Sequence, residues 1–151
     1  MQETVNIFQA GPIEGRIDLG ELAASSQTSA FVYDIAPGEA SCPYHYEYVE
    51  EWMLVVAGEA AVRTPEGERA VAAGGLVRFP AGPAGAHKIA NRGELPCRVL
   101  MFTRRSAPAV SVYPDSDKIG VWPSEDGTDD GFFVRSSGVA WSHGEDGWDR
   151  A

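Results

Sequence analysis

Four side chains that can bind metal lie within two short, strand-like stretches of the sequence. The segment "SCPYHYEYVEEWMLVVAGEA" (41–60) contains His45, Glu47 and Glu51, and His87 follows a loop rich in glycine and proline. His45 and Glu47 are two residues apart, so on a strand their side chains point to the same side. Two imidazoles and two carboxylates on neighbouring strands are a donor set that suits a divalent transition metal. Because a buried, unpaired carboxylate is costly, these residues indicate a cation or access for water.

Short strands separated by turns fill the middle of the chain. Alternating apolar, β-branched and aromatic residues are bounded by glycine and proline, which is typical of strands. We predict a hairpin turn at 65–67 and one helix at 19–26. The predicted strands cover 30–35, 44–48, 51–57, 60–64, 68–72, 76–79, 87–91 and 96–103. This succession indicates an all-β sandwich or barrel, whose curvature can bring the four candidate ligands together.

The stretch around the first three candidates resembles the first conserved motif of the cupin superfamily. That motif reads Gly, five residues, His-x-His, three or four residues, Glu, six residues, Gly. This chain has Gly38, six residues, "HYE" (45–47), three residues, Glu51, six residues and Gly58. The second histidine of the family motif is therefore replaced by Glu47.

The stretch around His87 is similar to the second cupin motif, which reads Gly, five residues, Pro-x-Gly, two residues, His, three residues, Asn. Here the pattern is Gly74, five residues, "PAG" (80–82), four residues, His87, three residues and Asn91. The loop before His87 is thus two residues longer than in the family. The phrases "FPAGPAGAH" and "YPDSDKIGV" further resemble small bacterial cupins that are sometimes labelled sugar-phosphate isomerases.

The resemblance implies a single all-β domain over residues 1–151. Its fold would be the cupin double-stranded β-helix, a jelly-roll-like antiparallel barrel, with a core at about 30–105 and an extension at 106–151 that wraps the barrel. Carried over position by position, the metal ligands would be His45, Glu47, Glu51 and His87. A carboxylate in place of an imidazole favours a harder ion such as Mn²⁺, Fe²⁺ or Zn²⁺ over copper(I).

A pocket beside the metal would hold a small organic molecule. We expect apolar lining from Met53, Val55, Phe79, Ile89 and Met101, and a neutral or singly charged ligand, because no lysine or arginine can be placed inside the barrel from the sequence. Two functions remain open. The protein could be a metal-dependent enzyme of dioxygenase or isomerase type, or a non-catalytic binding module with a degenerate or empty metal site.

Charge and hydropathy narrow the range of partners. The net charge is −10, from 12 Lys+Arg against 22 Asp+Glu, which argues against nucleic acid and anionic membrane surfaces. The sequence has neither a membrane-spanning apolar run nor a secretory signal, so we expect a cytoplasmic protein. We also expect a homodimer, in which the segments "VNIF" (5–8) and "AFVYDI" (30–35) pair across a two-fold axis.

Overall fold

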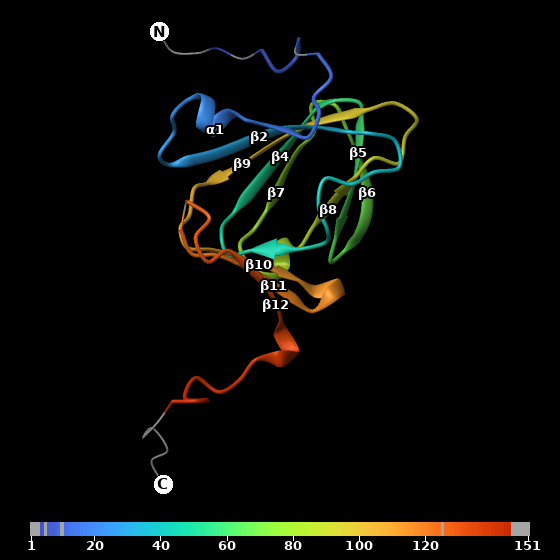
Figure 1. Cartoon of the computed structure of the whole chain (residues 1–151). Helices are drawn as coiled ribbons and strands as arrows, with labels where there is room; N and C mark the ends of the chain where they lie inside the picture. The colour runs from blue at the N-terminus through green and yellow to red at the C-terminus, as the bar shows by residue number, and fades with distance from the viewer. Residues whose placement is uncertain (1–3, 5, 10, 125, 146–151) are drawn as a thin grey trace.

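The computed structural model describes residues 4, 6–9, 11–124 and 126–145, and Figure 1 shows their arrangement. Its strands are β1 (Arg16–Asp18), β2 (Thr28–Ile35), β3 (Tyr46–Glu47), β4 (Glu51–Ala57), β5 (Glu59–Thr64), β6 (Gly67–Ala72), β7 (Leu76–Phe79), β8 (Lys88–Ala90), β9 (Cys97–Arg104), β10 (Ala109–Tyr113), β11 (Lys118–Trp122) and β12 (Gly131–Val134). Helical segments are short: α1 (Leu19–Leu22) and the 3₁₀ turns η1 (Pro83–Gly85), η2 (Pro114–Ser116) and η3 (Arg135–Ser137). The prediction of an all-β, jelly-roll-like fold is confirmed.

Two antiparallel sheets enclose the main core. One has the order β1-β2-β9-β4-β7 and the other the order β6-β5-β8. Strict alternation along β4 and β9 turns one face of each strand inward. The buried side chains between the sheets come from both layers and are Ile35, Met53, Val55, Ala60, Val62, Val77, Phe79, Ile89, Cys97 and Val99.

A third sheet, of order β12-β11-β10-β3, lies at the C-terminal end of the body (Figure 1). Residues 106–151 are expected from the sequence to be an extension that wraps the barrel, and none of the predicted strands lies there, but three strands form between residues 109 and 134. Strand β10 pairs with β3, where Ser111 lies opposite Glu47 and Val112 opposite Tyr46. A second, smaller core lies here, formed by Tyr44, Tyr46, Ala86 and Val112. The later part of the chain therefore packs against the segment that carries the first cupin motif.

The predicted helix is present but short. Asp18 caps its N-terminus, because Oδ1 accepts a hydrogen bond from the Glu21 amide at 2.8 Å. The helix ends after Leu22, and the chain turns back into β2. None of the helices within the described ranges is long and apolar enough to cross a lipid bilayer.

Candidate metal centre

The backbone brings His45 and His87 side by side although they lie far apart in the sequence. They form an isolated antiparallel bridge, in which the His45 amide donates to the His87 carbonyl at 3.0 Å and the His87 amide donates to the His45 carbonyl at 2.7 Å. Their ring centroids are 4.8 Å apart. This bridge also joins the strand segment before β3 to the segment before β8, so the two cupin motifs meet at the two imidazoles.

Each imidazole is oriented by a carbonyl of its own loop. His45 Nδ1 lies 2.9 Å from the Pro43 carbonyl oxygen, and His87 Nδ1 lies 2.9 Å from the Gly85 carbonyl oxygen. A carbonyl can only accept, so each Nδ1 carries a proton, and Nε2 is the ring atom left to bind a metal once it is unprotonated. Metal-binding histidines are commonly held in this way.

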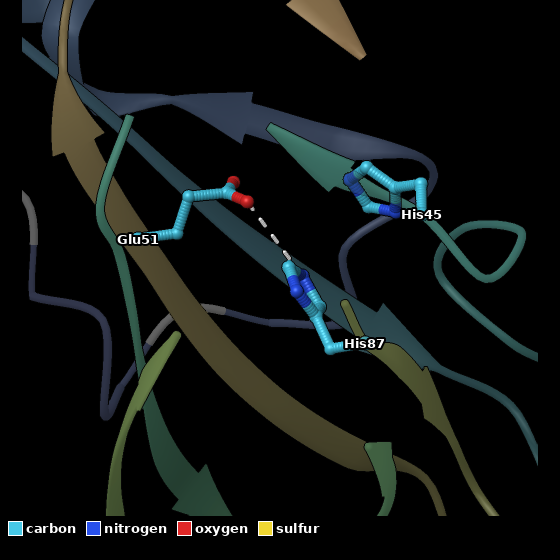
Figure 2. A group of neighbouring side chains, drawn as sticks. All are labelled: His45, Glu51 and His87. Carbon is cyan, nitrogen blue, oxygen red and sulfur yellow. Dashed lines mark ion pairs between the residues drawn. The ribbon is translucent and has the colours of Figure 1, made fainter. Parts of the chain in front are cut away.

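Glu51 completes a compact group of three ligands at the start of β4. Its Oε2 lies 3.8 Å from His87 Nε2, and the candidate donor atoms of His45, Glu51 and His87 all lie within 4.8 Å of one another. Figure 2 shows the three side chains facing a common space, with the Glu51–His87 contact as a dashed line. Metal–nitrogen and metal–oxygen bonds are about 2.0–2.2 Å long, so small side-chain rotations suffice for all three to share one ion.

The His87 ring supplies the strongest sign that the group fits a metal. Its side chain is 1% exposed, and Nε2 is a buried polar atom without a hydrogen-bond partner among the described residues. The 3.8 Å separation from Glu51 is too long for a hydrogen bond. A buried nitrogen lone pair that faces a carboxylate across this gap is a good ligand for a cation and is costly without one.

Burial and neighbouring charges shift the pKa values of all three groups. Burial lowers the pKa of His87 to about 4, so this ring is neutral at pH 7 and its contact with Glu51 is not an ion pair. Burial, followed by the charge of Glu47, raises the pKa of Glu51 to about 7. Burial alone would lower the pKa of His45, but interactions with Cys42, the Pro43 carbonyl and Glu51 raise it to about 9.

Glu47, the fourth predicted ligand, is engaged elsewhere. It lines the same cavity, but its Oε1 accepts a hydrogen bond from Ser111 Oγ at 2.7 Å, and it does not belong to the three-residue group. Ser111 is 1% exposed and follows Glu47 by 64 residues, so local spacing gave no sign of this partner. The structure thus brings together three of the four predicted ligands.

Two aromatic rings hold the imidazoles from the side. Phe79 stacks on His87, with centroids 3.8 Å apart and planes inclined by 13°. Tyr113, from β10, stacks on His45 at 5.7 Å and 23°. Phe79 is expected on the pocket wall from the sequence, whereas Tyr113 is not among the predicted site residues. Both residues restrict the rotation of a candidate ligand.

A cavity of about 430 Å³ opens beside the three ligands. Of the expected apolar lining, Ile89 and Met101 face it. Met53, Val55 and Phe79 lie instead in the main core and are at most 2% exposed. The difference follows from their depth, since Met53 is flanked in register by Val77 on one side and Met101 on the other, within the five-stranded sheet.

Charged side chains that the sequence could not place also face the cavity. Three are arginines and three are carboxylates: Arg16, Arg104, Arg105, Asp18, Glu47 and Glu51. The Arg16 guanidinium carbon lies 4.3 Å from the centroid of the Phe31 ring, which also lines the cavity. No lysine or arginine could be placed in the pocket from the sequence, whereas the structure places three arginines on its wall.

Comparison with known proteins agrees with this architecture. Residues 31–103 match the family model described as "Cupin domain", and this range includes all three members of the ligand group. Residues 31–103 therefore form a cupin domain. None of the curated proteins matches the sequence.

Several solved structures are similar to this one. A sugar phosphate isomerase from the cupin superfamily of Silicibacter pomeroyi superposes with a TM-score of 0.75 at 24% identity, covering 85% of this chain and 82% of that one. A protein from Acidithiobacillus ferrooxidans, provisionally named a sugar phosphate isomerase, gives a TM-score of 0.73 at 24% identity, covering 83% and 78%. The polyketide cyclase RemF from Streptomyces resistomycificus gives 0.58 at 17% identity, covering 72% and 84%. At these identities the likeness concerns the fold.

Proposed function

We propose that this cupin binds a divalent transition metal through His45, Glu51 and His87 and uses it to bind and activate a small organic acid in the adjoining cavity. The observation that carries the proposal is the buried His87 Nε2, which has no hydrogen-bond partner among the described residues and faces the Glu51 carboxylate. Two imidazoles and one carboxylate leave positions open for a ligand, as in non-haem iron sites. Mn²⁺, Fe²⁺ and Zn²⁺ suit this mixed nitrogen and oxygen set.

The arginines on the cavity wall favour an acidic ligand. Arg16, Arg104 and Arg105 offer planar donors that pair well with carboxylate or phosphate oxygens. The cavity volume of about 430 Å³ suits a small molecule. We expect the ligand's acid group to contact these arginines and a hydroxyl or carbonyl oxygen to face the metal ligands.

Within this site the chain's own residues have separable roles. The Pro43 and Gly85 carbonyls fix the imidazole tautomers, and Phe79 and Tyr113 hold the rings. When bound, the metal would supply Lewis-acid polarisation of a ligand carbonyl or hydroxyl. Because Glu47 is not in the three-residue group, its carboxylate is available to accept a proton from a bound ligand, with the Ser111 hydroxyl donating to Oε1.

This division of roles favours proton-transfer chemistry, of the isomerase kind, over simple binding. The proteins named sugar phosphate isomerases share the fold, and their names are in keeping with an acidic substrate. The substrate of this chain is a separate question, which a ligand screen addresses.

The metal proposal is tested by metal analysis of three proteins loaded in turn with Mn²⁺, Fe²⁺ and Zn²⁺. Wild type and His143→Ala, a matched control in the exposed C-terminal segment, should each retain about one ion per chain after gel filtration. His87→Ala should retain none. Wild-type protein that retains no ion would overturn the proposal.

The ligand and the reaction are tested on the metal-loaded protein. Small hydroxy acids, keto acids and phosphorylated sugars are screened by thermal shift, and stabilisation should require the metal. Compounds that bind are then followed by NMR for conversion. Glu47→Gln should keep the metal and lose conversion. Binding that is equally strong in His87→Ala would show that the metal does not take part.

A further inference from the structure

The centre of strand β2 has no open edge for a second copy of this chain, which the sequence led us to expect there. Phe31, Val32 and Tyr33 are paired on both sides, with β1 and with β9. The other segment expected in that pairing, 5–8, includes residue 5, which lies outside the described residues. The long-range pairing that bears on the metal centre lies within the chain, between β3 and β10.

Strand β10 lies alongside the strand of the first cupin motif in a fixed register. Ser111 lies opposite Glu47, and Val112 lies opposite Tyr46. Val112 and Tyr46 point into the second core, so by alternation the residues before and after them face the other way. On that other side Glu47 lines the cavity beside the metal centre. Strand β10 follows residues 31–103, so it lies outside the matched cupin domain.

A hydrogen bond from β10 fixes the Glu47 carboxylate. Ser111 is 1% exposed, and its hydroxyl donates to Glu47 Oε1 at 2.7 Å. A hydrogen bond of this length between a hydroxyl and a carboxylate, in a place that water hardly reaches, is a strong one. Tyr113, two residues further along the same face of β10, stacks on His45. Strand β10 therefore orients the side chains of both His45 and Glu47.

Glu47 lies within reach of the metal centre. On a strand it faces the same side as His45, two residues before it, and both side chains line the same cavity. Its charge contributes to the raised pKa of Glu51, so the two carboxylates are near neighbours. Glu47 nevertheless does not belong to the three-residue group of His45, Glu51 and His87. The contact that holds its carboxylate in the present position is the one with Ser111.

We propose that Ser111 is a positioning residue that keeps the Glu47 carboxylate from becoming a fourth metal ligand. A carboxylate without this hydrogen bond would be drawn to a divalent ion by its charge. Three side-chain ligands leave one more coordination position open than four, so the hydrogen bond preserves a position at which the small acid can bind. This inference rests on the metal function proposed above and assigns a role in it to a residue outside the matched domain.

The test counts the water molecules bound to Mn²⁺ in the loaded full chain. The relaxation rate of water protons reports the number of exchangeable waters on the ion, and competition with a chelator gives the Mn²⁺ affinity. Ser111→Ala should lose one bound water and bind Mn²⁺ about tenfold or more tightly, because a further carboxylate adds charge to the ligand set. Ser111→Thr keeps the hydroxyl and should retain the wild-type water count. Ser29→Ala, which removes another hydroxyl from the cavity wall, is the matched control and should change neither quantity.

Glu47→Gln separates the proposed effect from a general disturbance of the site. In the wild-type background this change should leave the water count as it is, because Glu47 is not a ligand there. In the Ser111→Ala background it should restore the wild-type water count, because a neutral amide is not drawn to the ion as a carboxylate is. Circular dichroism checks that every variant is folded.

The outcomes distinguish this inference from the metal function on which it rests. Wild-type protein that retains no ion overturns both. Wild-type protein that binds Mn²⁺, with an unchanged water count in Ser111→Ala, overturns the role of Ser111 and leaves the metal function standing. A gain of one bound water in Glu47→Gln alone would also overturn it, because Glu47 would then be a ligand in the wild type. Loss of a water in Ser111→Ala and its return in the double variant would establish the role of Ser111.

Discussion

Gly85→Ala is predicted to damage the candidate metal centre without touching a ligand. Gly85 is the last residue of η1, and its carbonyl oxygen lies 2.9 Å from His87 Nδ1. A Cβ added at Gly85 would lie 1.7 Å from the Pro80 carbonyl oxygen and 3.0 Å from the Pro80 nitrogen. Both are backbone atoms, so no side-chain rotation relieves the collision.

The size of the displacement follows from these distances. Real Cβ contacts do not fall below about 3.0 Å, so the two backbone segments must separate by at least about 1.3 Å. His87 cannot follow freely, because Phe79 stacks on its ring at 3.8 Å and its backbone is bridged to His45. The Nδ1 hydrogen bond should therefore lengthen or break. Loss of such a supporting contact typically costs about 10- to 100-fold in metal affinity, and overpacking costs about 1–3 kcal/mol of stability.

Two measurements check this prediction. Chelator competition gives the Zn²⁺ affinity, and proton NMR of the metal-free protein follows the His87 Nδ1–H resonance, which needs no metal. Gly82→Ala is the control in the same loop, because Gly82 has φ of +82° but open space around its Cβ position. It should cost about 1–2 kcal/mol in backbone strain and leave Zn²⁺ affinity nearly unchanged. A Gly85→Ala protein with wild-type affinity and an unshifted Nδ1–H signal would refute the reasoning.

Three further predictions concern stability and pH. Arg98→Ala should lower the free energy of unfolding by about 3 kcal/mol in urea denaturation, because Arg98 Nε and Nη2 bind the two carboxylate oxygens of Asp34 at 2.6 and 2.7 Å in a largely buried pair. The hydrogen bond from Arg98 lowers the pKa of Asp34, so this stabilisation is present above the unfolded pKa near 3.8 and is lost as pH falls through the lower folded value. Urea titrations between pH 5 and 2, at about one-unit steps, should show that loss in wild type and a smaller one in Arg98→Ala. Zn²⁺ affinity should rise with pH, because the pKa of His45 is about 9 and that of Glu51 about 7, and both groups must lose their protons before the metal binds. Calorimetry in two buffers of different ionisation heat measures the number of protons released on binding.

The parts of the fold that the sequence predicted depend on local signals. Strands β4, β7 and β9 lie within one residue of their predicted bounds, because their alternation of inward and outward residues is read directly from the chain. Strands β10, β11 and β12 were missed. "AVSVY" and "KIGVW" do alternate, but each is only five residues long and lies among acidic turn residues. Strand β10 also pairs with β3, which lies far away in the sequence, so pairing as well as propensity decides the state of this strand.

In the candidate site, too, residues that belong to local motifs could be predicted and the others could not. His45, Glu51 and His87 could be named from spacing and from the cupin resemblance, since each belongs to a motif with fixed offsets. The role of Glu47 could not be predicted, because its carboxylate accepts a hydrogen bond from Ser111, which lies 64 residues later. The position of the arginines on the cavity wall could not be predicted from the sequence either. Arg104 and Arg105 follow the inward-facing stretch of β9, and only the curvature of the sheets shows that this end faces the cavity.

The charges that line the cavity should couple the binding of the metal to the binding of the acidic ligand. Above about pH 9, where His45 and Glu51 have both lost their protons, the three arginines and three carboxylates of the lining balance, so a divalent ion then changes its formal charge from about neutral to about +2. An acidic ligand should therefore bind weakly to the metal-free site and more strongly to the loaded one. Thermodynamic linkage requires the ligand to raise the metal affinity by the same factor. Titrations in both orders should give equal coupling factors above one, and a factor of one would mean that the arginines and the metal act on separate ligands.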